Sequence, residues 1–111
     1  MCKRLRIAIT VGDPSGIGPE ISLKAAEDAR VQAAGEVVLY GPTTDAELAA
    51  FPSGKVTAEA GRSAYQTIKR AVSDVQAGRA DALVTAPINK EAFAEAGLPW
   101  RGHSELLAHL T

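Results

Sequence analysis

Three short apolar runs, each followed by a turn that contains glycine or proline, constrain this chain more than any other feature. The runs cover residues 5–10, 36–40 and 82–86, and each predicts a buried strand. Segments with helical spacing separate them, and the strongest covers residues 62–76 and ends at Gly78. Strands that alternate with helices predict an α/β architecture, in which a mostly parallel sheet is the middle of three layers.

Shorter helices complete the predicted order β-α-β-α-α-β-α-α. They are expected at about residues 20–30, 44–50, 90–96 and 104–110. Thr44 and Glu47 have the spacing of a capping box, which supports the second of these helices. Residues 51–61 show no clear periodicity.

Composition excludes several classes of protein. The chain has 111 residues, enough for one domain at most, with a net charge of −1 and no basic face for nucleic acid. No apolar run approaches the roughly 20 residues that a membrane helix needs, and no secretory signal is visible. Cys2 is the only cysteine, so no disulfide can form within the chain, which fits a cytoplasmic location.

The first candidate site is the segment Gly-Asp-Pro-Ser-Gly-Ile-Gly-Pro-Glu at residues 12–20, between a predicted strand and a predicted helix. Its glycines and the helix N-terminus suit an anion, and ligands of α/β proteins often bind at such strand ends. The segment matches neither the dinucleotide fingerprint nor the P-loop. A tight turn in which Asp13 accepts hydrogen bonds from local backbone is an equally good interpretation.

Two further segments follow the third strand. In Val-Thr-Ala-Pro-Ile-Asn-Lys, residues 84–90, Asn89 can cap a helix and Lys90 can present an ammonium group, although a solvated lysine is the simpler interpretation. In the segment of residues 97–105, His103 and Ser104 can bind a polar ligand. The alternative there is an ordinary helix start, with Ser104 as the N-cap and His103 exposed. Two histidines without a suitable cysteine make no zinc site.

Together, in this order, the three segments resemble motifs of the 4-hydroxythreonine-4-phosphate dehydrogenase family. The resemblance extends over nearly the whole chain except about residues 51–60. It implies part of an isocitrate/isopropylmalate dehydrogenase-like domain, so that residues 1–111 would be the N-terminal part of a two-domain enzyme whose remainder is absent. The segment between Tyr40 and Gly61 also looks shorter than in the family.

What the resemblance implies about activity is an oxidoreductase of pyridoxine and pyridoxal phosphate biosynthesis. Such enzymes are cytoplasmic homodimers that oxidise 4-phosphohydroxy-L-threonine with NAD or NADP and a divalent metal (Zn, Mg or Co). A related branch of the family, the 4-phosphoerythronate and 4-phosphothreonate dehydrogenases, acts on phosphorylated four-carbon sugar acids.

The resemblance assigns substrate binding to His103 and Ser104, where the family has His-Thr. It makes Lys90 and Asp13 weaker candidates for the cleft. It assigns no catalytic residue and no metal ligand to this chain, because the metal-binding histidines and most of the nucleotide site of the family lie beyond the match. The chain alone is therefore expected to be inactive. It could be a fragment of the enzyme, a half that works with a separate chain, or a non-catalytic truncated paralogue.

Overall fold

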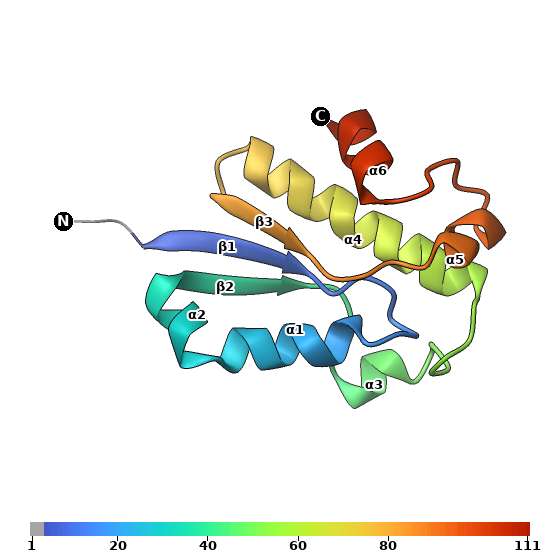
Figure 1. Cartoon of the computed structure of the whole chain (residues 1–111), viewed down its shortest axis with the longest axis horizontal. Coiled ribbons are helices and arrows are strands. Elements are labelled where there is room, and N and C mark those ends of the chain that lie inside the picture. Colours follow the sequence, from blue (N-terminus) through green and yellow to red (C-terminus); the bar gives the residue numbers. More distant parts are fainter. Residues whose placement is uncertain (1–3) are drawn as a thin grey trace.

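A three-stranded parallel sheet forms the centre of the protein in the computed structural model, which describes residues 4–111 (Figure 1). Its strands are β1 (Leu5–Thr10), β2 (Gly35–Tyr40) and β3 (Ala82–Thr85), in the spatial order β2-β1-β3. Both neighbours of β1 run parallel to it. The predicted α/β class and parallel sheet are therefore confirmed. Cys2, from which we predicted the absence of a disulfide, lies outside the described residues.

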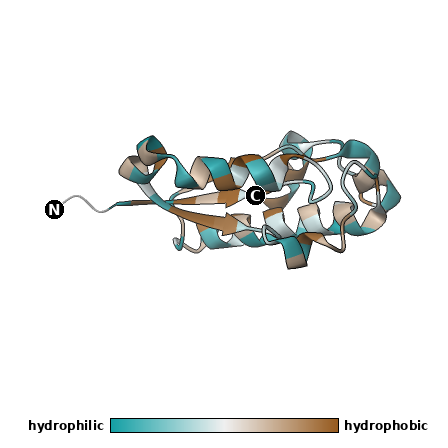
Figure 2. Cartoon of the chain, turned by 90° about the horizontal axis from the view of Figure 1, so that it is seen from below, coloured by the Kyte–Doolittle hydropathy of each residue, from teal (hydrophilic) through white to brown (hydrophobic). Residues whose placement is uncertain are grey.

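Helices cover both faces of this sheet, as Figure 2 shows from below. They are α1 (Gly18–Glu27), α2 (Ala29–Ala34), α3 (Asp45–Leu48), α4 (Ala58–Gln76), α5 (Lys90–Glu95) and α6 (His103–Leu110). Successive residues of β1 face opposite layers, because side chains alternate along a strand. Ala8 packs in one cluster with Ala71 of α4, whereas Ile9 lines a hollow with Ile21 of α1.

The main core lies between α4, α5 and α6. Ile68, Phe93 and Leu106, one from each helix, are completely buried there. Burial of such a side chain contributes about 1.5–3 kcal/mol. This packing fixes α5 and α6, which carry two of the three candidate segments, against the long helix α4.

The single helix predicted over residues 20–30 is wrong. The chain leaves the helical conformation at Asp28, whose ψ of 128° is extended, and α2 then begins at Ala29. The Asp28 carboxylate accepts a hydrogen bond from the backbone N–H of Arg30 at 2.8 Å, so it caps α2. An aspartate inside a periodic segment was the signal for this break.

The capping predictions have mixed outcomes. Thr44 and Glu47 form the predicted capping box, and Asn89 caps α5 by accepting from the N–H of Ala92 at 3.0 Å. The alternative in which Ser104 is the N-cap is wrong, because α6 begins at His103, with Gly102 at the cap position and Ser104 inside the helix. Gly102 has no side chain to satisfy the first N–H groups of this helix.

Candidate functional site

The first and second candidate segments lie against each other where β1 and β3 end. The N–H of Asp13 donates to the carbonyl of Pro87 at 2.9 Å, and the N–H of Ala86 donates to the carbonyl of Thr10 at 2.9 Å. Gly12 has a φ of +72°, and a Cβ atom at this position would overlap the Pro87 carbonyl oxygen. Only glycine allows the two segments to approach this closely.

The Asp13 side chain forms a hydrogen bond within its own turn. Its carboxylate accepts a hydrogen bond from the N–H of Ser15 at 2.9 Å, and only 7% of the residue is exposed. This geometry is that of the local-turn interpretation. Asp13 does not line the pocket that contains the other candidate residues, so its contribution to a cleft stays a prediction.

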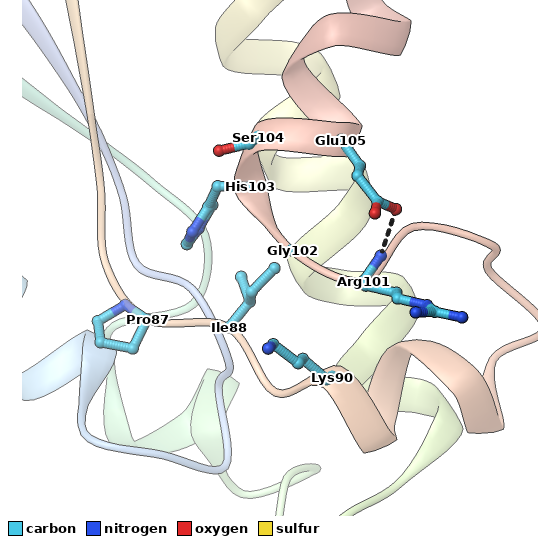
Figure 3. Close-up of a pocket in the computed structure, with 8 residues that line it drawn as sticks. All are labelled: Pro87, Ile88, Lys90, Arg101, Gly102, His103, Ser104 and Glu105. Carbon is cyan, nitrogen blue, oxygen red and sulfur yellow. Dashed lines mark hydrogen bonds between the residues drawn. The ribbon is translucent and has the colours of Figure 1, made fainter.

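An open pocket of about 540 Å³ brings the other three candidates together. Lys90 comes from the second segment, and His103 and Ser104 come from the third. Figure 3 shows the Lys90 ammonium directed toward Ile88, whereas the Arg101 guanidinium points to the other side. The full lining consists of Pro87, Ile88, Lys90, Arg101, Gly102, His103, Ser104 and Glu105.

Local structure explains why these side chains meet. The Asn89 cap starts α5 at Lys90, which is one of the residues that line the pocket. On the other side, the Trp100 ring stacks on Tyr65 of α4 with 5.2 Å between the ring centroids. Trp100 therefore holds the turn that leads into α6, and His103 follows as the first residue of that helix.

His103 is half-buried, so the alternative interpretation, in which this histidine is exposed at an ordinary helix start, is wrong. Burial lowers the pKa of the imidazole from its ordinary value of 6.5, and the nearby Ala86 backbone opposes this shift. The Nε2 atom is buried and makes no hydrogen bond of good geometry within residues 4–111. Because such an atom is costly to leave without a partner, it marks a position where a ligand oxygen would be stabilised.

Sequence reasoning did not single out Arg101 and Glu105 as lining residues. Both lie inside the third segment, and their charge was the available signal. The Glu105 carboxylate accepts a hydrogen bond from the N–H of Arg101 at 3.1 Å, which closes the turn before α6. This carboxylate is therefore engaged with the backbone of its own turn.

The described residues hold no group of three or more His, Cys, Asp or Glu side chains arranged for a metal ion. No helix among residues 4–111 is both long and apolar enough to cross a bilayer. The pocket thus offers an ammonium group, an imidazole, a hydroxyl and a helix N-terminus. These groups suit a small anionic ligand.

Fold and pocket together define the class: an α/β protein with the isocitrate dehydrogenase-like fold of its structural neighbours. The family model described as pyridoxal phosphate biosynthetic protein PdxA matches residues 5–111. The chain therefore belongs to the PdxA family, which confirms the resemblance inferred from the motifs.

The known proteins with this similarity include enzymes named as dehydrogenases of phosphorylated substrates. The chain is 37% identical to the D-threonate 4-phosphate dehydrogenase of Salmonella typhimurium, and the match covers 95% of this chain and 43% of that enzyme. It is 34% identical to the 4-hydroxythreonine-4-phosphate dehydrogenase of a Janthinobacterium species, and this match covers 100% of this chain and 43% of that enzyme. The chain superposes on a crystal structure of 4-hydroxythreonine-4-phosphate dehydrogenase from Burkholderia phymatum with a TM-score of 0.81 and 30% sequence identity. The superposition covers 98% of this chain and 44% of that enzyme. The chain thus spans less than half the length of these relatives.

The alignment with the Janthinobacterium enzyme also indicates an internal difference in length. It extends over 149 positions although this chain has 111 residues, so at least 38 positions are gaps in this chain. This supports the expected internal shortening. Its location between Tyr40 and Gly61 stays a prediction.

Proposed function

We propose that this chain forms one wall of the substrate site of a dehydrogenase that acts on a phosphorylated hydroxy acid, with 4-phosphohydroxy-L-threonine as the first candidate. The observation that carries the proposal is the convergence of Lys90, His103 and Ser104 in one pocket, although they belong to two separate segments. The match to dehydrogenases of such substrates supports the same assignment.

Each of the three residues supplies a donor suited to an anionic substrate. Lys90 offers a full positive charge, and His103 offers a buried ring nitrogen that makes no hydrogen bond of good geometry, although the nearby Ala86 backbone acts on the imidazole. Ser104 offers a hydroxyl beside the uncapped N-terminus of α6, whose first N–H groups have no intrahelical acceptor. Together these donors bind and orient the substrate.

Oxidation of the substrate itself requires a hydride acceptor and a metal ion, which these three residues do not provide. NAD or NADP would take the hydride with the help of a divalent metal (Zn, Mg or Co). Residues 4–111 offer no three-ligand metal site, so we assign the metal ligands and most of the nucleotide site to polypeptide outside this chain. Residues 1–111 would then be the N-terminal part of a two-domain, homodimeric, cytoplasmic enzyme of pyridoxal phosphate synthesis.

A second candidate substrate is a phosphorylated four-carbon sugar acid such as D-threonate 4-phosphate. It is favoured by relatives of that name from Salmonella typhimurium and Pectobacterium atrosepticum, which are 37% and 34% identical to this chain. The two candidates differ at the carbon that carries an amino group in one and a hydroxyl in the other. The phosphate end, which we assign to Lys90 and His103, is common to both.

Titration of the isotopically labelled chain, followed by NMR, tests the proposal with both substrates and with inorganic phosphate. Binding should shift the resonances of Lys90, His103 and Ser104. Lys90→Met or His103→Ala should each weaken binding about tenfold, the effect of losing one hydrogen bond that involves a charged group. Lys69→Met, which removes the same charge from an exposed position on α4 outside the pocket, is the matched control.

Two results would contradict the assignment. One is the absence of shifts around the pocket at millimolar ligand. The other is binding that Lys69→Met weakens as much as Lys90→Met does. A clear preference for D-threonate 4-phosphate over 4-phosphohydroxy-L-threonine would favour the second candidate substrate.

A further inference from the structure

Arg101 is a second cationic residue of the pocket, and no ligand group has been assigned to it above. It lines the cavity together with Lys90, and the charged ends of the two side chains point in opposite directions (Figure 3). The cavity of about 540 Å³ has the size of a small-molecule site. Positive charges at two sides of one cavity complement a ligand that is anionic at both ends.

The Arg101 guanidinium is available to bind a carboxylate. The residue is exposed, and within residues 4–111 no carboxylate oxygen lies within 4.0 Å of its side-chain nitrogen atoms. Several other arginines of the same part of the chain do form such ion pairs, namely Arg6, Arg30, Arg62 and Arg79. Arg101 thus keeps its planar fork of N–H donors, which matches the two oxygen atoms of a carboxylate.

The backbone of Arg101 is held in place although its side chain is exposed. Its N–H donates to the Glu105 carboxylate at 3.1 Å, and the preceding residue, Trp100, stacks on Tyr65 of α4. Only side-chain torsions therefore have to change when the guanidinium meets a ligand, which limits the entropic cost of binding. Glu105 also adds a negative charge to the lining, so Arg101 determines whether a second anionic group is attracted or repelled there.

Both candidate substrates have an anionic group at each end. 4-Phosphohydroxy-L-threonine and D-threonate 4-phosphate each carry a carboxylate on the first carbon and a phosphate on the fourth. Once the phosphate is placed at Lys90 and His103, the carboxylate is the group left for a second cation. Arg101 is the other cationic residue of the lining.

We propose that Arg101 is a specificity-determining residue, whose guanidinium binds the carboxylate of a phosphorylated four-carbon acid. The inference rests on the proposed function, because the position of the phosphate is taken from the assignment of Lys90 and His103. Its consequence is selectivity: the pocket prefers a ligand with a carboxylate and a phosphate over a phosphate monoester that has no carboxylate.

NMR titration of the isotopically labelled chain with a matched pair of ligands tests this selectivity. D-threonate 4-phosphate is compared with the polyol phosphate in which a hydroxymethyl group replaces the carboxylate, at low salt because charges at an exposed residue are screened. Arg101→Met should weaken binding of the acid about tenfold and binding of the polyol phosphate less than about twofold, since only the acid loses a hydrogen-bonded ion pair. Arg101→Lys should recover part of the loss, because the ammonium group keeps the charge but not the planar fork. Arg62→Met, which removes the same charge from an exposed position on α4 outside the pocket, is the matched control and should leave both affinities unchanged.

Equal weakening of the two ligands by Arg101→Met, or no weakening of either, would overturn the proposal and leave the phosphate assignment of Lys90 intact. An equal loss of acid binding in Arg62→Met would also overturn it, because only the overall charge of the chain would then matter. The proposed function, and this inference with it, would fail in a different way. In that case neither ligand shifts the resonances of Lys90 and His103 in the wild type, or Lys90→Met binds both ligands as tightly as the wild type does.

Discussion

Gly12 shows how one residue determines whether the candidate segments can meet. A residue other than glycine at this positive φ would destabilise the fold by about 1–2 kcal/mol. Its Cβ atom would also overlap the Pro87 carbonyl. Gly12→Ala should therefore lower the free energy of unfolding by at least about 3 kcal/mol, since steric overlap adds to the backbone strain. Urea denaturation measures this loss.

Gly78 provides the matched control for that substitution. It has a similar φ of +80°, but nothing lies within 4 Å of a Cβ atom built there. Gly78→Ala should cost only the backbone strain, about 1–2 kcal/mol. Equal losses in the two variants would mean that the close approach of the two segments contributes nothing.

His103 should make stability depend on pH in a defined direction. Burial lowers its pKa below the ordinary 6.5 in the folded chain, so the unfolded chain takes up the proton first as pH falls. The stabilising contribution is complete above about pH 6.5 and is lost as pH falls through the pKa of the folded state. The free energy of unfolding should thus decline below about pH 6.5 in the wild type and less in His103→Gln, as measured by urea denaturation at several pH values.

Ser104→Ala is the control for His103, because it alters the pocket and keeps the imidazole. It should retain the wild-type pH dependence. A His103→Gln variant whose stability follows pH as the wild type does would show that this imidazole is not destabilised by protonation. The carboxylates with lowered pKa are Asp28, Glu47 and Asp74. They titrate below their ordinary values of 3.8, 4.5 and 3.8 and do not interfere in this window.

At the scale of elements, local sequence signals predicted the sheet and most helices, since each depends on spacing or a cap. The strand of residues 5–10 and the capping box at Thr44 are examples, and both are confirmed. The break at Asp28 was missed because helical periodicity continues across it. The first turn of α4, from Ala58, was missed because its cap, Thr57, lies in a stretch without periodicity.

The contact between α4 and α5 depends on Gly61, which the sequence did not identify. A Cβ atom at this position would overlap the carbonyl of Ala92 in α5. Glycine-to-alanine substitution within a helix usually stabilises it by about 0.4–1 kcal/mol. Gly61→Ala should instead destabilise the chain by about 1–3 kcal/mol, because the two helices must separate.

Denaturation with urea gives the sign of this change, and NMR shifts of Lys90 report whether α5 moves. Gln66→Ala, at an exposed position of α4, should change stability by no more than about 0.5 kcal/mol. A Gly61→Ala variant that is more stable than the wild type would show that α4 and α5 do not pack as closely as the structure has them.

For the whole molecule, the resemblance predicted that Lys90, His103, Ser104 and Asp13 border one cleft, and the structure brings the first three together in one pocket without Asp13. Lys90 meets His103 because α5 and α6 both pack on α4, and that packing depends on contacts such as Phe93 with Ile68. Asp13 is directed into its own turn by a single hydrogen bond to Ser15. Neither outcome follows from spacing along the chain, because both depend on side chains that meet only in the folded state.

The pocket formed by this packing is open to solvent on one side, and this leads to a prediction for the chain as a whole. Residues 1–111, given NAD or NADP, a divalent metal and either phosphorylated substrate, should produce no reduced nicotinamide above background. A dehydrogenase must hold the substrate and the nicotinamide in a fixed relative position and must exclude water from them. An open pocket with three donor groups can bind the anionic substrate but does not meet these two requirements. The Salmonella typhimurium relative, assayed under the same conditions, is the positive control. Turnover by the 111-residue chain would show that its pocket is a complete active site, whereas phosphate binding without turnover fits one wall of a larger site.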